Sequence, residues 1–204
     1  METAGNHKFR RDVRKMKREV QIVASGAGWQ EFDVSKEIWI LLKPFLKCGF
    51  GTRIFSMDGF NINLVESGKI TKEQIIEKIG DIEFTTNENF PMDDIPEEQR
   101  YFTNSVCYMI AMAILEGYER VELYGVNQMG LFEYMEQRRG VEFWVGYALG
   151  RGIEVVINEP SKLLTNSADT PYGYEKSEGL KAERKAKGGI KKVIDLVGYV
   201  QGIR

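Results

Sequence analysis

The stretch from Tyr101 to Leu164 constrains the fold of this chain more than any other part of it. Its hydrophobic patterns predict a helix, a strand, a second helix and a second strand, over residues 106–117, 120–126, 131–152 and 153–157. Helices and strands that alternate through short, glycine-containing connections are typical of a parallel α/β sheet. We therefore expect a three-layer α/β fold with a mostly parallel sheet.

The preceding residues supply further elements for the same sheet. Apolar runs predict strands over residues 19–25, 36–42, 53–57 and 81–85. A helix is expected over residues 71–79, where Thr71 and Gln74 have the spacing of a capping box. Residues 88–99 contain two prolines and five acids, which exclude a central strand or a helix interior and predict a mobile connection beside the site.

Charge is distributed unevenly along the chain. Residues 1–18 carry a net +5 and residues 175–204 a net +4, although the whole chain carries −2. We expect a basic N-terminal arm over 1–18, one α/β domain over 19–174 and a basic helical tail over 175–204. Because the domain itself is strongly acidic, nucleic acid is not an expected partner.

The sequence also predicts the cellular compartment of the protein. No apolar run approaches the roughly 20 residues that span a bilayer, and the first residues lack the apolar core of a secretory signal. The two cysteines, Cys48 and Cys107, are far apart in sequence and are expected to be reduced thiols. We therefore expect a cytoplasmic protein with no membrane contact.

Two candidate ligand contacts follow predicted strands. Gly26 and Gly28 come directly after the first strand, where glycines allow a backbone to approach a phosphate closely. The dinucleotide fingerprint needs a third glycine, so this pair indicates either a phosphate cradle or a tight structural turn. Asp58 follows the third strand and is expected to hold a ribose or a metal, or to form an Asp-Gly turn with Gly59.

A second group of candidates surrounds the two predicted helices. Thr103, Asn104 and Ser105 stand where the first helix begins, as caps of its amides and as an anion site. Asn127 follows the strand between the helices and is expected to contact the nucleotide as well.

The second helix begins with further polar residues. Glu133, Gln137 and Arg138 lie near its start, where they are expected to face an acceptor substrate. The spacing of Arg138 and Glu142 also fits a surface ion pair.

The residue types limit the chemistry. The only histidine, His7, lies in the basic arm, so a catalytic base inside the fold must be a carboxylate, such as Asp58, Glu133 or Glu142, of which we favour Asp58 and Glu133. Neither CxxC nor HxxxH spacing nor a carboxylate-rich metal loop is present, so no metal site formed by the protein alone is expected. Any Mg²⁺ is expected to arrive with a nucleotide.

The segments YFTNSVCYMIAMAILEGYERVELYGVN and EYMEQRRGVEFWVGYALGRGIEVVINEPSKLL resemble a group of small Rossmann-like bacteriophage and prophage proteins. More distantly, the glycine turn, the capped helix and the strand ending in LYGV resemble two transferase groups. One is the 6-hydroxymethylpterin diphosphokinase-like family and the other the bacterial sialyltransferase-like proteins. The resemblance implies a Rossmann-like fold and nucleotide contacts at Gly26, Gly28, Asn104 and Ser105. These relatives carry Asp at the position of Asn127, and the sialyltransferase histidine has no counterpart here.

Together these features predict a phage-type protein that binds a nucleotide or nucleotide sugar and acts as a glycosyl- or diphospho-transferase in the host cytoplasm. The alternative is a non-catalytic phage protein, either a binder of a nucleotide signal or a structural or host-interaction component. Phe132, Phe143 and Trp144 lie off the main apolar stripe of their helix, which suggests a homo-oligomer.

Overall fold

The computed structural model describes residues 17–60, 63–127 and 132–165, without the side chains of residues 63, 64 and 132–134. The chain divides into a compact unit that ends at Leu163 and a second unit from Leu164 onward, of which only Leu164 and Thr165 are described. The predicted basic tail and most of the predicted basic arm lie outside the described residues.

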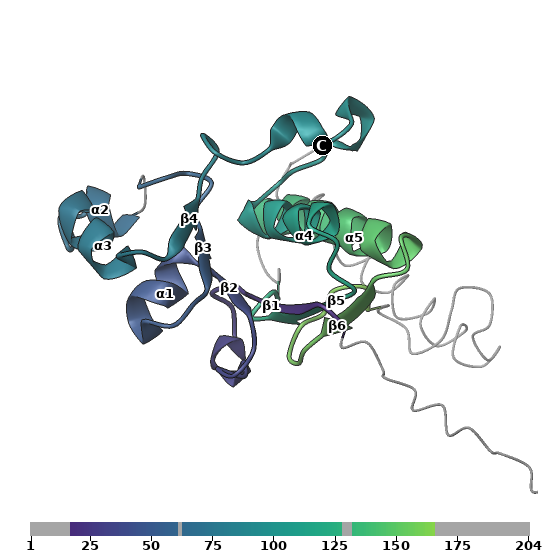
Figure 1. Ribbon diagram of the computed structural model, residues 1–204, viewed down its shortest axis with the longest axis horizontal. Coiled ribbons are helices and arrows are strands. Elements are labelled where there is room, and N and C mark those ends of the chain that lie inside the picture. The colour runs from purple at the N-terminus through teal and green to yellow at the C-terminus, as the bar shows by residue number, and fades with distance from the viewer. Residues whose placement is uncertain (1–16, 61–62, 128–131, 166–204) are drawn as a thin grey trace, which may run out of the picture. The chain divides into compact units, whose positions relative to one another are not determined.

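The centre of the first unit is a six-stranded sheet in which every pair of neighbouring strands is parallel (Figure 1). The strands are β1 (Glu19–Val23), β2 (Ile38–Leu41), β3 (Arg53–Phe55), β4 (Glu83–Thr85), β5 (Arg120–Tyr124) and β6 (Glu154–Ile157). The prediction of a Rossmann-like α/β fold is confirmed. Every predicted strand is present, and each is shorter than predicted at one or both ends.

The strand order, β4-β3-β2-β1-β5-β6, fixes where a ligand crevice can form. From β1 the chain moves outward through β2, β3 and β4, and then returns to the other side of β1 to form β5 and β6. The connections after β1 and β5 therefore leave in opposite directions. In open α/β sheets this reversal creates a crevice at the carboxyl ends of the two strands.

Five α-helices connect the strands: α1 (Leu42–Cys48), α2 (Asn63–Glu66), α3 (Lys72–Ile79), α4 (Ser105–Leu115) and α5 (Phe132–Gly150). The predicted capping box of α3 is confirmed, because Thr71 and Gln74 exchange both hydrogen bonds. Helix α1 was not predicted. It begins directly after β2, and Pro44 stands in its first turn, where the missing amide of proline costs nothing.

The helices cover both faces of the sheet and produce the three layers. Helices α4 and α5 lie side by side over one face, and α1 and α3 pack on the other (Figure 1). Along β1, Val20 and Ile22 enter the core under α4 and α5, whereas Val23 faces the core under α1 and α3. In the described part of the chain, no helix combines the length and apolarity that crossing a bilayer would require.

Helix α5 buries a face that differs from the predicted stripe. Val141, Val145 and Ala148 are buried as expected, but Leu149 is 47% exposed. Trp144, predicted to lie off the stripe, is only 1% exposed because Phe102 stacks on it at a centroid distance of 4.9 Å. The segment before α4 therefore widens the buried face of α5.

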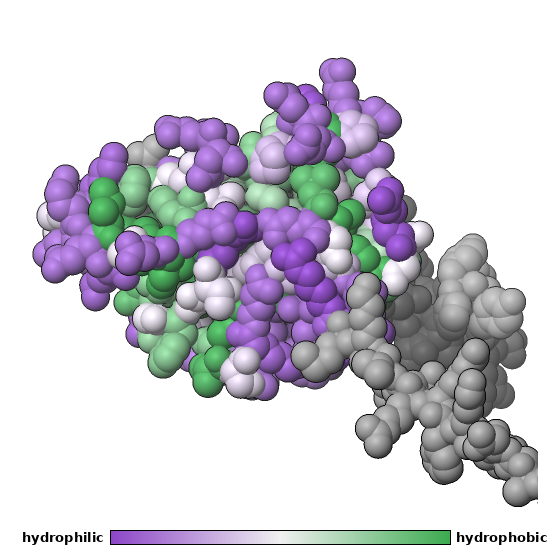
Figure 2. Space-filling view, in the orientation of Figure 1, coloured by the Kyte–Doolittle hydropathy of each residue, from purple (hydrophilic) through white to green (hydrophobic). Residues whose placement is uncertain are grey.

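The acidic connection between β4 and α4 is anchored to the core. It forms two short 3-10 turns, η2 (Met92–Asp94) and η3 (Glu97–Gln99). Phe90 and Ile95 are buried beneath it, so the expected mobile connection is instead fixed by apolar contacts. In the space-filling view, hydrophobic side chains appear beside this hydrophilic segment, where Figure 1 places helices α4 and α5 (Figure 2).

Candidate functional site

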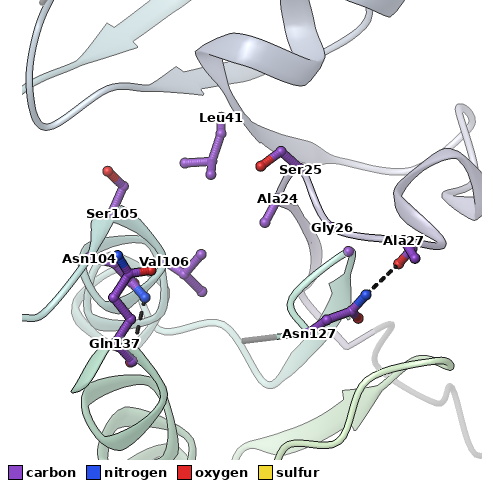
Figure 3. A pocket seen from close by; sticks show the side chains of 11 residues that line it. Ala24, Ser25, Gly26, Ala27, Leu41, Asn104, Ser105, Val106, Asn127 and Gln137 are labelled. Carbon is purple, nitrogen blue, oxygen red and sulfur yellow. Dashed lines mark hydrogen bonds between the residues drawn. The ribbon is translucent and has the colours of Figure 1, made fainter. Parts of the chain in front are cut away.

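A cavity of about 430 Å³ lies at the reversal of the strand order, beyond the carboxyl ends of β1 and β5. Such a volume is within the range of small-molecule sites. We call this cavity the crevice; Figure 3 shows side chains of residues that line it. The lining comprises Ala24, Ser25, Gly26, Ala27, Leu41, Asn104, Ser105, Val106, Gly125, Asn127 and Gln137.

The amino terminus of α4 forms one wall of the crevice. Asn104 is the N-cap, and its Oδ1 accepts a hydrogen bond from the Cys107 amide at 3.2 Å. The Asn104 Nδ2 lies 3.5 Å from the Gln137 carbonyl oxygen on α5. Because Asn104 satisfies only the third amide of the helix, the amides of Ser105 and Val106 have no intrahelical partner. These amides give the wall a partial positive charge.

The loops after β1 and β5 form the opposite side of the crevice and touch each other. The Gly26 amide donates a hydrogen bond to the Gly125 carbonyl oxygen at 2.8 Å. A Cβ atom on Gly26 would lie 2.4 Å from that oxygen, which is a steric clash. Glycine at position 26 is therefore required by the close approach of two backbones.

Asn127 ties the same two loops together through its side chain. Its Nδ2 donates to the Ala27 carbonyl oxygen at 3.3 Å (Figure 3). Its Oδ1 is buried and has no hydrogen-bond partner among the described residues. An aspartate here would lose the donor and place a carboxylate near a carbonyl oxygen, which explains why the amide suits this position.

The crevice offers a ligand neutral polar groups. Ser25 and Leu41 lie on one side, and Asn104, Ser105 and Gln137 on the other (Figure 3). The hydroxyls of Ser25 and Ser105 form no hydrogen bond with another described residue, so they are free to bind a ligand. Among the described lining residues none carries a charged side chain, so these residues supply hydrogen bonds but no general acid or base.

Three predicted site residues are not part of the crevice lining and make structural contacts instead. Gly28 has φ +78°, and a Cβ atom there would lie 2.7 Å from the Glu159 carbonyl oxygen. Thr103 donates its hydroxyl to the Gln137 carbonyl oxygen at 3.0 Å, across the α4–α5 interface. Arg138 pairs with Glu142 at 2.7 Å and donates to the Lys162 carbonyl oxygen at the same distance. The ion pair predicted from the spacing of Arg138 and Glu142 is thus present, and the acceptor contact of Arg138 stays a prediction.

Of the two predicted catalytic carboxylates, Asp58 lines a different cavity and the Glu133 side chain is not described. Asp58 lies in the turn after β3, where the Gly59 amide donates to the Ser56 carbonyl oxygen at 2.8 Å. Together with Lys72 and Glu88 it lines a separate cavity of about 720 Å³, which we call the β3–β4 cavity. Glu133 is the second residue of α5, and its side chain lies outside the described part of the structure.

No other described group near the crevice supplies a reactive centre. Burial raises the pKa of the Cys107 thiol, despite opposing hydrogen bonds with Thr103 and Asn104, so this cysteine is a neutral thiol at pH 7. Within residues 17–60, 63–127 and 132–165, no cluster of three or more His, Cys, Asp or Glu side chains has the arrangement of a metal site.

Several lining residues were not predicted, including Ser25, Leu41 and Gly125. Ser25 has a recognisable signal for a ligand contact, because it directly precedes the glycine turn at the carboxyl end of β1. Leu41 has none, since an apolar residue at the end of β2 has the pattern of any core strand.

Comparison of the chain with models of known protein families, with curated proteins and with solved structures found no match. The function of this chain is therefore inferred from the geometry of the described residues.

Proposed function

We propose that the crevice binds the phosphate-bearing part of a nucleotide or nucleotide sugar. The observation that carries this proposal is the position of the crevice at the reversal of the strand order, with the amino terminus of α4 in its wall. Parallel α/β sheets bind ligands at such reversals, and the free amides of a helix terminus attract anions.

In this proposal, the phosphate is bound by neutral donors. The amides of Ser105 and Val106 and the hydroxyls of Ser25 and Ser105 are the groups available to it. In the described part of the lining there is no lysine or arginine, so there the helix dipole is the main local compensation for the phosphate charge. Any Mg²⁺ would be carried by the phosphates themselves.

The geometry supports binding more directly than catalysis, because none of the crevice-lining residues that the structure describes has a titratable side chain. One observation nevertheless favours a glycosyl- or diphospho-transferase. The β3–β4 cavity lies at the carboxyl ends of neighbouring strands on the same edge of the sheet, and it contains Asp58 and Glu88. In that second candidate function an acceptor would occupy the β3–β4 cavity, and Asp58 would accept its proton.

A thermal-shift titration with ATP, GTP, UDP-glucose and CMP-sialic acid, with and without Mg²⁺, tests the binding proposal. A ligand that binds only the folded state raises Tm. We expect at least one of these compounds to raise Tm, and Ser105→Ala to reduce the shift. Ser35→Ala is the matched control, because Ser35 bonds Asp33 in the β1–β2 connection and does not line the crevice.

Equal Tm shifts in Ser105→Ala and the wild type would place the ligand elsewhere. A flat screen would favour the non-catalytic structural or host-interaction alternative. Asp58→Asn separates binding from transfer: a transferase would keep its Tm shift and lose product formation, whereas a pure binder would form no product in either protein.

A further inference from the structure

A second small cavity, of about 300 Å³, lies between α4, α5 and the acidic connection that precedes α4. We call it the outer cavity. It shares no lining residue with the crevice or the β3–β4 cavity. Its lining comes from the carboxyl-terminal halves of both helices, whereas the crevice lies at their amino-terminal ends. A ligand in the outer cavity would therefore contact different residues from a ligand in the crevice.

The inner part of the outer cavity is apolar and fixed. Ala111, Trp144 and Ile95 have exposed fractions of 0%, 1% and 3%. The Trp144 indole donates its N–H to the Tyr101 carbonyl oxygen at 2.9 Å, which holds the ring in place. Ile114 and the partly exposed Leu115 complete the apolar wall. This surface suits an aliphatic or aromatic group.

The mouth of the outer cavity carries one acid and one base. Asp94 and Arg151 are the only charged residues in its described lining, and neither forms an ion pair with another described residue. The Arg151 guanidinium lies over the Tyr147 ring, with its Cζ 5.9 Å from the centroid. By contrast, the bases along the strands, such as Arg53 and Arg120, are each paired with glutamates. The two charges at the mouth thus remain available to a ligand.

We propose that the outer cavity binds a free α-amino acid with a large apolar side chain. The side chain would occupy the apolar interior, the carboxylate would bind Arg151 and the ammonium group would bind Asp94. A ligand with a single charge would leave one of the two residues without a partner. A zwitterion matches both, and charge-assisted hydrogen bonds to each end would provide specificity.

Isothermal titration of the full chain with L-leucine, L-phenylalanine and L-tryptophan tests this proposal. Each amino acid is compared with its amide, which lacks the carboxylate, and with its N-acetyl form, which lacks the ammonium group. We expect at least one free amino acid to bind, and each of its blocked forms to bind roughly tenfold more weakly or worse, because each loses a hydrogen bond between charged groups.

Two variants assign the contacts. Arg151→Met should remove the preference for the free amino acid over its amide. Asp94→Asn should remove the preference for the free amino acid over its N-acetyl form. Asp93→Asn and Arg139→Gln are matched controls, since both residues are exposed and neither lines the outer cavity. Circular dichroism confirms that each variant is folded.

The proposal is overturned if no free amino acid binds at millimolar concentrations, or if the acid and its blocked forms bind equally well. It is also overturned if both variants retain the wild-type preferences. Stronger binding of an apolar amine than of the amino acid would show that Asp94 acts without Arg151, and would likewise exclude a zwitterion site.

Discussion

Glu122 is a nearly buried carboxylate in the middle of β5, with an exposed fraction of 6%. It accepts hydrogen bonds from Arg120 at 2.9 Å, from Lys36 at 3.2 Å and from Tyr124 at 3.1 Å. Burial by itself would raise the pKa of Glu122, but these three hydrogen bonds outweigh burial and hold the pKa below its ordinary value of 4.5. Glu122 is therefore charged in the folded protein and stabilises it through its partners.

This arrangement makes stability depend on pH in a defined direction. Because the pKa of Glu122 is lower in the folded than in the unfolded state, its contribution is complete above pH 4.5 and is lost as the pH falls through the folded pKa. We expect Glu122→Gln to lower the free energy of unfolding by about 1–3 kcal/mol at pH 7, and by less at pH 3.

Urea unfolding at both pH values measures this difference. Glu77→Gln, at an exposed position of α3, is the control and should have little effect at either pH. A destabilisation by Glu122→Gln that is the same at pH 7 and pH 3 would show that the carboxylate contributes through packing and not through its charge.

At the scale of elements, two glycines of α5 have opposite surroundings. A Cβ atom on Gly140 would lie 2.0 Å from the Thr103 Oγ1 and 3.0 Å from the Thr103 Cβ, at the α4–α5 interface. A Cβ atom on Gly146 would meet nothing within 4 Å. Glycine at position 140 thus allows the two helices to approach closely beside the crevice, whereas glycine at position 146 only weakens the helix.

The two glycines provide a matched pair of substitutions. Gly146→Ala should raise the free energy of unfolding by about 0.5–1 kcal/mol, because alanine favours a helix more than glycine does. Gly140→Ala gains the same helix propensity but must displace Thr103, and we expect a net loss of about 1–3 kcal/mol.

Chemical denaturation of both variants tests this difference between the two positions. Gly140→Ala should also weaken any ligand bound in the crevice, because Thr103 holds the Gln137 carbonyl oxygen. Equal stabilisation by the two substitutions would mean that the α4–α5 interface adjusts without cost.

At the scale of the whole molecule, the sheet has a protected centre and exposed edges. β1 pairs with β2 on one side and with β5 on the other, and its residues Ile22 and Val23 have no exposed surface. The edge strand β4 has three residues and one neighbour. Strands paired on both sides and covered by helices open only when most of the domain unfolds.

Hydrogen exchange followed by mass spectrometry should show this gradient. We expect the amides of β1 and β5 to exchange most slowly, those of β2 and β6 faster, and those of β4 and α2 fastest. A ligand in the crevice should slow exchange in the loops after β1 and β5 before it affects β4. Exchange in β4 as slow as that in β1 would contradict the strand order.

The elements that were predicted correctly carry local signals in the sequence. The long helices α4 and α5 have apolar patterns over several turns, and Thr71 and Gln74 form a capping box from residues only three positions apart. The apolar strands between tight turns predicted the parallel sheet. Helix α1 was missed because its apolar residues continue the pattern of β2 without a break.

The candidate site was predicted only in part. Gly26, Asn104, Ser105, Asn127 and Gln137 were selected because they stand at the expected ends of strands and helices, and these five do line one cavity. Thr103 and Arg138 were selected for the same reason, but they are engaged in contacts of α4 with α5 and of α5 with Lys162. Position along the chain does not distinguish a residue that lines the cavity from one that makes a structural contact.

The sequence by itself determined the class of fold and the positions of most elements, because hydrophobic periodicity and caps act over a few residues. Only the tertiary structure decided which polar groups face a cavity. Asp58 and Gly26 both follow strands, but β3 and β1 are separated by β2, so the two residues line different cavities. Such neighbourhoods depend on strand order and on contacts between loops about a hundred residues apart, such as that of Asn127 with Ala27. No local pattern specifies these contacts, because their free energy depends on the packing of the whole sheet.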